Sequence, residues 1–384
     1  MTTAAGRLPT DSPGSPGAPP APAGGPAGDG PTEDEPVVGV RVRVPATSAN
    51  LGPGFDAYGL ALAYYDDLEV TLRRRGLSVH VEGGEPVSEG EDNLVVRSIR
   101  ATFDALGRPQ PGLAVRCVNR IPHGRGLGSS AAAIVAGVAA AWALDPAGFL
   151  ADGAGQPKAA AGALDRAAAL RVATAIEGHP DNVGAALFGG FTVAWTGPDG
   201  AAVHRAQPVA DLRPVAFVPS ARTSTADSRG RLPERLAHAD AAFSAGRAGL
   251  LALALTGAVA GSSTDGPARP PELRPADPRA PGARPAGLRP LDAPARARLL
   301  LTATEDRLHQ PYRLPMAPES AGLVERLRAA GVAAVLSGSG PTVLALAVGG
   351  EQAATAVAVP APGFAVLPLA VDREGARVTP LALG

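Results

Sequence analysis

The stretch from Pro122 to Ala133 reads P-H-G-R-G-L-G-S-S-A-A-A and joins a glycine-rich segment to an alanine-rich one. An alternating apolar run precedes it, and an alanine-rich run typical of a helix follows it. Its three alternating glycines let backbone N–H groups approach an anion, because no Cβ stands in the way. Ser129 and Ser130 fall at the predicted helix start, where unpaired N–H groups and the helix dipole attract phosphate. The stretch therefore predicts a phosphate-binding loop.

Three familiar nucleotide-binding motifs do not match this loop. A Walker A loop requires Gly-Lys before Ser or Thr, and the chain contains no Gly-Lys pair. The dinucleotide fingerprint G-x-G-x-x-G fails because Ser129 stands in place of its third glycine, which disfavours a dinucleotide-dependent oxidoreductase. The H-R-D and D-F-G motifs of protein kinases are missing. The simplest local alternative is a helix cap after a flexible glycine loop.

Composition excludes several other classes of protein. The 384 residues include 35 Lys and Arg against 36 Asp and Glu, a net charge of −1, so charge does not favour a nucleic-acid partner. Cys117 is the single cysteine, which excludes an internal disulfide framework. The longest apolar run, 131–144, is too short to span a bilayer, and the N-terminus lacks a signal-peptide pattern. We therefore expect a cytoplasmic protein without a membrane partner.

The chain divides by composition into two lobes and two biased segments. Residues 1–36 are rich in Gly, Pro and Ala and predict a disordered tail. A Pro/Arg-rich insertion spans about 262–294; we interpret it as a tolerated surface insertion, with a basic interaction loop as the alternative. Strand and helix patterns interleave without the regular period of a doubly wound sheet, which predicts an α+β fold in two lobes. The predicted lobes are 37–205 and 206–384.

Two further motifs place polar groups between apolar segments. The first, P-A-T-S-A-N-L-G-P-G-F-D at 45–56, has Asn50 and Asp56 on either side of a Gly-Pro-Gly turn, which suits ligand orientation or plain turn chemistry. The second, E-G-H-P-D-N at 177–182, begins with Glu177 at a predicted helix end. A negative charge is unfavourable there, which hints at another role for that carboxylate.

A last glycine-rich motif, L-S-G-S-G-P-T-V at 336–343, lies between two predicted strands. It is either a second anion-binding turn or an ordinary tight turn.

Taken together and in this order, the motifs resemble those of the GHMP kinase superfamily. Within it, S-A-N-L-G-P-G-F-D, E-G-H-P-D-N and D-R-L-H-Q-P-Y-R are similar to motifs of the homoserine kinases. The resemblance covers about 37–261 and 295–350. It implies the two-lobed GHMP kinase fold, with an N-terminal ATP-binding lobe like the second domain of ribosomal protein S5 and a ferredoxin-like C-terminal lobe. The site is expected between the lobes.

The resemblance also implies an activity. Homoserine kinases transfer the γ-phosphoryl of ATP, with Mg²⁺, to the side-chain hydroxyl of L-homoserine, which is a step of threonine biosynthesis. The resemblance also allows for a homodimer. One alternative is another small-molecule kinase of the superfamily, acting for example on mevalonate or shikimate. The other is a catalytically silent binding protein of the same fold.

Individual residues acquire expected roles from the resemblance. The residues expected on the ATP phosphates are Pro122, His123, Gly124, Arg125, Gly126, Leu127, Gly128, Ser129 and Ser130, with Asn93 near the adenine. Mg²⁺ is expected on Ser130 and Glu177, with Asp165 as the other acid of the preceding helix. The residues expected on the acceptor are Asn50, Asp56, His179, Asn182, Thr225, Arg229, Arg313 and Gly338. Those expected to act on the reacting atoms are Asn50, Asp181, Asn182 and Arg229.

The chemistry of the acceptor residues suits an amino acid. Asp56 can hold an ammonium, and Arg229 and Arg313 can fork onto an α-carboxylate. Lys158 is the only lysine of the chain, so a lysine–aspartate base is not expected. Phosphoryl transfer needs mainly positioning and charge neutralisation, so the γ-phosphate itself is expected to take the proton, with Asp181 as the fallback base.

Overall fold

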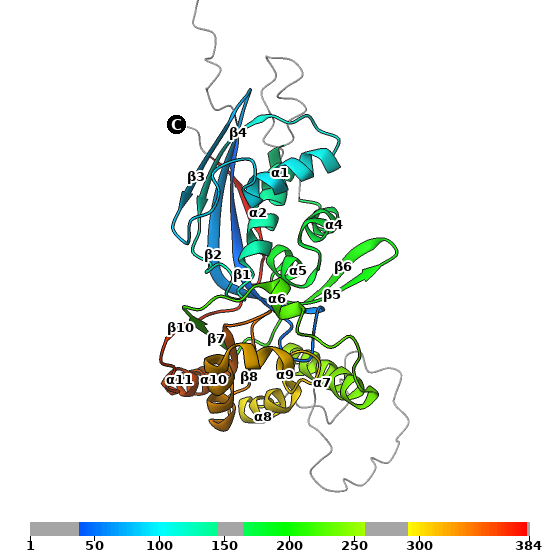
Figure 1. The fold of residues 1–384 in the computed structure, drawn as a ribbon, viewed down its shortest axis with the longest axis vertical. Helices are drawn as coiled ribbons and strands as arrows, with labels where there is room; N and C mark the ends of the chain where they lie inside the picture. The colour runs from blue at the N-terminus through cyan, green and yellow to red at the C-terminus, as the bar shows by residue number, and fades with distance from the viewer. Residues whose placement is uncertain (1–37, 145–163, 258–290, 382–384) are drawn as a thin grey trace, which may run out of the picture.

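The computed structural model describes residues 38–144, 164–257 and 291–381. These residues form two sheets, each covered by helices, in two lobes stacked along the long axis of the molecule (Figure 1). The predicted tail at 1–36, Lys158 and all but the last residues of the predicted insertion lie outside the described residues. The α+β prediction is confirmed.

The first sheet is built from the first third of the chain and receives strands from further along. Its strands are β1 (Gly39–Ala49), β2 (Tyr58–Arg73), β3 (Leu77–Glu82), β4 (Gly112–Val118), β5 (Phe191–Gly197), β6 (Gly200–Ala206) and β11 (Arg377–Pro380). The main path runs β11-β1-β2-β4-β3, and the β5–β6 hairpin pairs with the start of β2. Alternation in β1 buries Val40, Val42 and Val44 on one face while Arg41 and Arg43 face solvent.

Helices cover only the apolar face of this sheet (Figure 1). They are α1 (Leu94–Ala105), α2 (Ser129–Leu144), α4 (Arg166–Glu177) and α5 (Asp181–Phe188). The central one is α2, which contacts β1 as well as the other three helices. Its alanines make this possible, because small side chains allow neighbouring backbones to approach on nearly every side. The N-terminus of α2, at Ser129, is thereby fixed where the two lobes meet.

The second sheet has the order β10-β7-β9-β8 and is antiparallel throughout. Its strands are β7 (Leu212–Pro219), β8 (Ala334–Leu336), β9 (Val343–Val348) and β10 (Phe364–Pro368). The helices of this lobe are α6 (Thr225–Arg229), α7 (His238–Thr256), α8 (Ala293–Ala303), α9 (Gln310–Arg313) with the 3₁₀ turn Leu314–Met316, α10 (Pro318–Ala329) and α11 (Gly349–Ala358). The connection of strand, helices, two strands, helix and strand is ferredoxin-like, as expected.

The end of the chain departs from the predicted division. The sequence places residues 377–380 in the C-terminal lobe, but β11 pairs with β1 in the first sheet, with Val42 opposite Val378. The pairing covers the open edge of β1, whose backbone groups would otherwise lack partners. The first sheet is therefore completed only by the last part of the chain.

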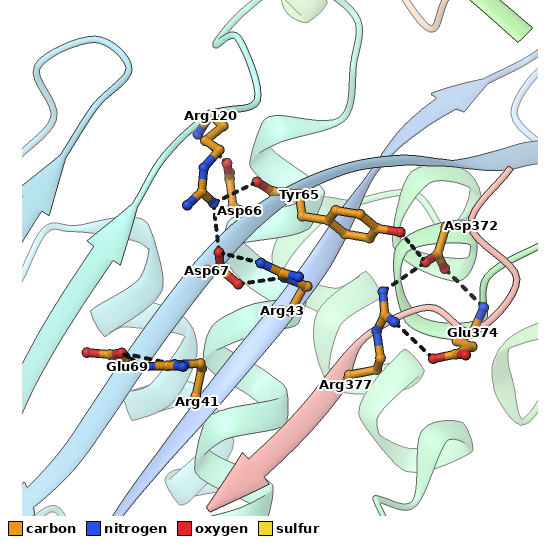
Figure 2. Close-up of polar contacts among 10 residues, drawn as sticks. All are labelled: Arg41, Arg43, Tyr65, Asp66, Asp67, Glu69, Arg120, Asp372, Glu374 and Arg377. Atoms are coloured by element: carbon orange, nitrogen blue, oxygen red, sulfur yellow. Dashed lines mark hydrogen bonds and ion pairs between the residues drawn. The ribbon is translucent and has the colours of Figure 1, made fainter. Parts of the chain in front are cut away.

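The outer face of the first sheet carries rows of ion pairs (Figure 2). Arg41 lies opposite Glu69 and Arg43 opposite Asp67 across the β1–β2 ladder, so strand register alone brings each pair together. Arg120 extends the second row by donating to Asp67 at 2.7 Å. This face remains in water, whereas the opposite face packs on α2. No helix of the described residues is long and apolar enough to cross a membrane.

Candidate active site

The predicted phosphate loop is held in shape by backbone contacts to both lobes. Gly126 and Gly128 have φ angles of +81° and +70°, and a Cβ on either would overlap a neighbour, the Ser337 carbonyl and the Thr47 hydroxyl respectively. The Gly126 carbonyl accepts the Ser337 hydroxyl at 2.5 Å, and the Leu127 carbonyl accepts the Thr47 N–H at 3.0 Å. Glycine is required at both positions because the conformation is left-handed and the space is taken.

The contacts of the loop with other described residues use its carbonyl groups as hydrogen-bond acceptors and do not involve the N–H groups of its three glycines. The carbonyl of Gly124 accepts the Thr223 N–H at 2.9 Å, and that of Arg125 accepts from Thr342 at 3.2 Å. In contrast, the N–H groups of Gly124, Gly126 and Gly128 donate to no described residue. They remain as donors for an anion at the start of α2.

Two cavities lie on either side of this helix start. The first has a volume of about 240 Å³ and mostly apolar walls, among them Leu68, Val87, Leu94, Val95, Cys117, Ala132, Ala133 and Ala136. Seven polar residues also line it: Asp66, Asp67, Asn93, Asn119, His123, Ser129 and Ser130. Asn93 caps α1, accepting the Val95 N–H at 2.9 Å and donating to the Ser88 carbonyl at 2.7 Å. Asn93 thus lines this cavity with its amide already held by the protein, and its contact with adenine stays a prediction.

The second cavity is smaller, about 110 Å³, and polar. Its lining brings together nearly all the predicted acceptor residues from both lobes: Asn50, Asp56, His179, Asp181, Asn182, Arg229, Arg313 and Gly338. Gly124, Gly126, Gly128, Ser129, Ser130 and Glu177 form its side toward α2. Thr225 begins α6, and its side chain is outside the described part of the structure. Thr223, which sequence reasoning missed, lines the cavity.

Asp56 and Arg229 form an ion pair across this cavity. The two guanidinium Nη atoms of Arg229 donate to the two oxygens of Asp56, both at 2.9 Å. The Asp56 carboxylate raises the pKa of Arg229, so the arginine stays charged. Asp56 has a φ of +56° in the loop after β1, and Arg229 ends α6 in the other lobe. The pair therefore joins two segments that no strand register connects.

Arg313 is the second cation and is buried, with 4% of its surface exposed. Its Nη1 donates to the Gly338 carbonyl at 3.3 Å, while its Nε has no hydrogen-bond partner among the described residues. Burial lowers the pKa of Arg313, because desolvation disfavours the charged form. The Phe55 ring lies 5.2 Å from the guanidinium of Arg313 and 5.8 Å from that of Arg229. An anion bound beside Arg313 would compensate the positive charge that burial has removed from water.

The amide side chains expected to orient the acceptor also have structural partners. Asn50 donates to the Gly338 carbonyl at 2.9 Å and accepts the Asp56 N–H at 2.9 Å, so it links the first and last glycine motifs. Asn182 accepts the Thr47 hydroxyl at 2.8 Å. Both side chains are thereby held at the cavity wall.

Asp181 and His179 form a second charged group on the cavity wall. Asp181 begins α5, where the helix dipole favours its negative charge, and it accepts the Asn182 N–H at 2.6 Å. Its carboxylate lies 3.5 Å from His179 Nδ1 and raises the pKa of that imidazole. The histidine therefore carries its proton over a wider pH range than usual.

Ser130 and Glu177 meet where the two cavities adjoin. The Ser130 hydroxyl donates to a Glu177 carboxylate oxygen at 2.7 Å, and burial raises the pKa of Glu177. Asp165 caps the opposite end of α4 by accepting the Ala167 and Ala168 N–H groups at 3.0 Å. Only Glu177 of these two acids is thus placed beside Ser130. The described residues contain no group of three or more His, Cys, Asp or Glu side chains that could hold a metal ion by themselves.

Arg125 has a different place from the rest of the loop. Its guanidinium donates to the Pro219 carbonyl at 3.0 Å and to Glu85 at 2.7 Å, and the side chain lines neither cavity. Pro122 and Leu127 line neither cavity either, so these three residues do not face the space where the ATP phosphates are expected.

The chain is similar to known proteins over most of its length. Residues 93–190 match the GHMP kinases N terminal domain, and residues 291–361 match the GHMP kinases C terminal domain. A homoserine kinase of Streptomyces avermitilis is 48% identical over 346 residues, which covers 89% of this chain and 96% of that protein. The chain belongs to the homoserine kinase family. A homoserine kinase of Streptomyces coelicolor is 47% identical over 345 residues, covering 89% and 95% of the two chains.

A solved structure supports the fold of this homoserine kinase family member. The crystal structure of homoserine kinase from Cytophaga hutchinsonii matches with a TM-score of 0.66 at 24% identity, covering 89% of this chain and 97% of that one. The family and the two-lobed GHMP kinase fold predicted from the motifs are confirmed.

Proposed function

We propose that the protein transfers the γ-phosphoryl of ATP to the side-chain hydroxyl of L-homoserine, forming O-phospho-L-homoserine for threonine biosynthesis. The observation that carries this proposal is the meeting of the two cavities at Ser129 and Ser130. The apolar cavity suits the nucleotide, the polar cavity suits a small zwitterion, and the glycine-loop amides lie between them. A γ-phosphoryl held by those amides faces the polar cavity.

The charges of the polar cavity select an amino acid. Asp56 and Arg229 neutralise each other in the free protein, so a ligand that separates them has to supply both charges. Homoserine supplies an ammonium for Asp56 and a carboxylate for Arg229 and Arg313. A hydroxy acid such as mevalonate supplies only the carboxylate and leaves Asp56 unpaired, which is costly in a partly desolvated site.

Ser130 and Glu177 fit a magnesium ion bound together with ATP. Mg²⁺ prefers oxygen ligands and is commonly held by one or two protein groups plus substrate phosphates. A hydroxyl and a carboxylate within 2.7 Å of each other, at the junction of the cavities, supply such oxygens. When bound, the ion would neutralise part of the phosphate charge.

The transfer itself requires little chemistry from side chains. The homoserine hydroxyl oxygen forms a bond to the γ-phosphorus, and the bond from that phosphorus to the oxygen bridging the β-phosphate breaks, so ADP leaves. The hydroxyl proton passes to the transferred phosphoryl group. Asp181 lines the same cavity and is the alternative acceptor; Asp181→Asn is expected to keep measurable turnover if the phosphoryl takes the proton.

The direct test is a coupled ADP-release assay with Mg²⁺, ATP and five acceptors. These are L-homoserine, L-threonine, L-serine, mevalonate and shikimate. Turnover on homoserine well above the other four is the expected result. Bound ATP without turnover on any acceptor contradicts the proposal and favours a silent binding protein, whereas preference for mevalonate or shikimate reassigns the acceptor. The cytoplasmic location and the homodimer stay predictions, to be checked by cell fractionation and analytical ultracentrifugation.

A further inference from the structure

His309 is a buried side chain for which the proposed reaction has no direct use. It belongs to the D-R-L-H-Q-P-Y-R segment at 306–313, is 0% exposed, and does not line the acceptor cavity. Its Nε2 lies 2.8 Å from the Gly52 carbonyl, and its Nδ1 lies 3.2 Å from Nη1 of Arg313. Its ring stacks on Phe55 with 5.2 Å between centroids and 27° between planes. The imidazole thus touches two of the segments that present charges to the cavity, the loop that carries Asp56 and the helix that carries Arg313.

The two partners determine the tautomer of His309. A carbonyl oxygen only accepts, so Nε2 must carry the proton that is donated to Gly52. A guanidinium only donates, so Nδ1 must offer its lone pair to Arg313. Burial lowers the pKa of His309 to about 4, which keeps the ring neutral at physiological pH. Only the neutral Nε2–H form satisfies both contacts.

The Asp306–His309 contact does not account for this arrangement. Asp306 lies 3.4 Å from His309 Nε2, but its two oxygens already accept the N–H groups of Leu308, His309 and Gln310 at 2.7 to 3.2 Å. The carboxylate therefore binds backbone N–H groups just before and at the start of α9, and the shorter contact of the imidazole is to Gly52. His309 is oriented toward the loop of the other lobe.

The contacts of His309 connect two of the segments that bind the acceptor in the proposed reaction. Gly52 belongs to the loop that carries Asp56, while Arg313 comes from α9 of the second lobe. The side chain of Phe55, pressed against His309, lies beside the guanidinium groups of both arginines. One imidazole therefore sets the position of Arg313 relative to the loop that carries Asp56.

We propose that His309 is a positioning residue that holds Arg313 for the α-carboxylate of the acceptor while tying the 50–56 loop to the second lobe. The inference rests on the proposed function, because it requires Arg313 to bind that carboxylate. Two substitutions separate the two contacts. In His309→Gln, the side-chain amide nitrogen can replace the donor to Gly52, but no acceptor is left at the position of Nδ1, where Arg313 donates. In His309→Asn, the side-chain amide oxygen can replace the acceptor for Arg313, but the shorter side chain does not reach Gly52.

The test compares His309→Gln and His309→Asn in steady-state kinetics. His309→Gln is expected to raise the KM for homoserine about tenfold with an unchanged KM for ATP, the size of one lost hydrogen bond to a charged group. His309→Asn is expected to stay within about threefold of the wild type, since the bond to Arg313 is kept. Equal losses in the two variants would overturn the proposal.

An analogue of the acceptor without its carboxylate distinguishes the loss of Arg313 positioning from general damage to the site. Aminopropanol is homoserine without its carboxylate, and its inhibition constant is measured against homoserine turnover. It should change less than about twofold in His309→Gln if the loss acts through Arg313. If both ligands weaken alike, His309 has only a structural role. Absence of wild-type turnover on homoserine would instead refute the proposed function, so the two failures are distinguishable.

A measurement on the wild-type protein tests the tautomer of His309 even if both variants fold poorly. Nitrogen NMR of the imidazole, assigned through contacts to the Phe55 ring protons, should show a protonated Nε2 and an unprotonated Nδ1 between pH 6 and pH 9. A protonated Nδ1 would exclude the bond from Arg313 and overturn the inference.

Discussion

Two arginine–carboxylate pairs of this protein have nearly the same geometry and different surroundings. On the outer face of the first sheet, Arg43 donates to both oxygens of Asp67 at 2.8 and 3.1 Å. In the acceptor cavity, Arg229 donates to both oxygens of Asp56 at 2.9 Å. The first pair is fixed by strand register, with Arg120 as a further partner of Asp67 (Figure 2). The second joins two lobes through side chains alone.

The role of each ion pair depends on whether the backbone holds its two residues together. Opening the pair on the sheet would gain nothing for a ligand, because the ladder keeps the two residues opposite each other. Opening the Asp56–Arg229 pair exposes two opposite charges to a cavity, which a zwitterion can replace one for one. The same contact is therefore structural in one place and a preformed ligand site in the other.

The largest effect is expected from Arg229→Lys compared with Arg41→Lys on the sheet. Lysine keeps the charge but loses the planar fork, so kcat/KM for homoserine should fall about 100-fold in Arg229→Lys. Arg41 lies on the solvent-facing side of β1, so Arg41→Lys should leave kcat/KM for homoserine unchanged. Steady-state kinetics of both variants checks this. Equal effects would break the distinction between the two kinds of pair.

The next effect concerns the carboxylate beside Ser130. Glu177→Gln should raise the Mg²⁺ concentration for half-maximal activity about tenfold, since a neutral amide is a weaker ligand for a hard cation. Burial raises the pKa of Glu177, so at limiting Mg²⁺ the wild-type rate should rise with pH through that raised pKa as the carboxylate ionises. The variant should lack this rise. Glu69→Gln on the outer face is the control, and an altered Mg²⁺ dependence there would contradict the assignment.

A smaller effect concerns stability. Asp181 raises the pKa of His179, so the His179–Asp181 interaction stabilises the fold fully below the ordinary histidine pKa and is lost as pH rises through the raised value. His179→Gln should therefore lower Tm at pH 6, by the equivalent of roughly 1 kcal/mol or less, and hardly at pH 9. His204→Gln, an exposed histidine of β6, should lower Tm at neither pH. A Tm difference that grows with pH would contradict the sign.

The smallest effect is expected on the outer face itself. Arg41→Ala should reduce the free energy of unfolding by less than about 1 kcal/mol, and less still at high salt, because its pair with Glu69 is solvent-exposed. Urea denaturation at two salt concentrations measures this. A loss of several kcal/mol would show that the sheet rows are more than cross-strand surface pairs.

Much of the site could be predicted because its motifs are local. Glycine alternation before a helix predicted the loop. The unfavourable charge of Glu177 at the end of α4 hinted at another role; the structure places the Ser130 hydroxyl on that carboxylate, and its binding of Mg²⁺ stays a prediction. The missed elements are short or lack a clear period: α5 begins inside a Gly- and Pro-containing motif, and β11 has only four residues. Thr223 carried no signal, since its place in the cavity depends on how the segment after β7 crosses to the loop.

His309 shows why the rest needed tertiary structure. Its motif suggested a function, but its partners, Gly52 and Phe55, lie about 250 residues earlier in the chain.

The glycine-rich loops and the helix start at Ser129 follow from the sequence alone, because backbone sterics and local spacing depend only on neighbouring residues. The family is recognised from the resemblance of its motifs. Only the tertiary structure decided that Glu177 rather than Asp165 meets Ser130, and that β11 closes the first sheet. It also decided that Asp56 and Arg229 neutralise each other across the lobes. Such contacts join segments far apart in the chain, and their distances are set by the packing of whole sheets and helices.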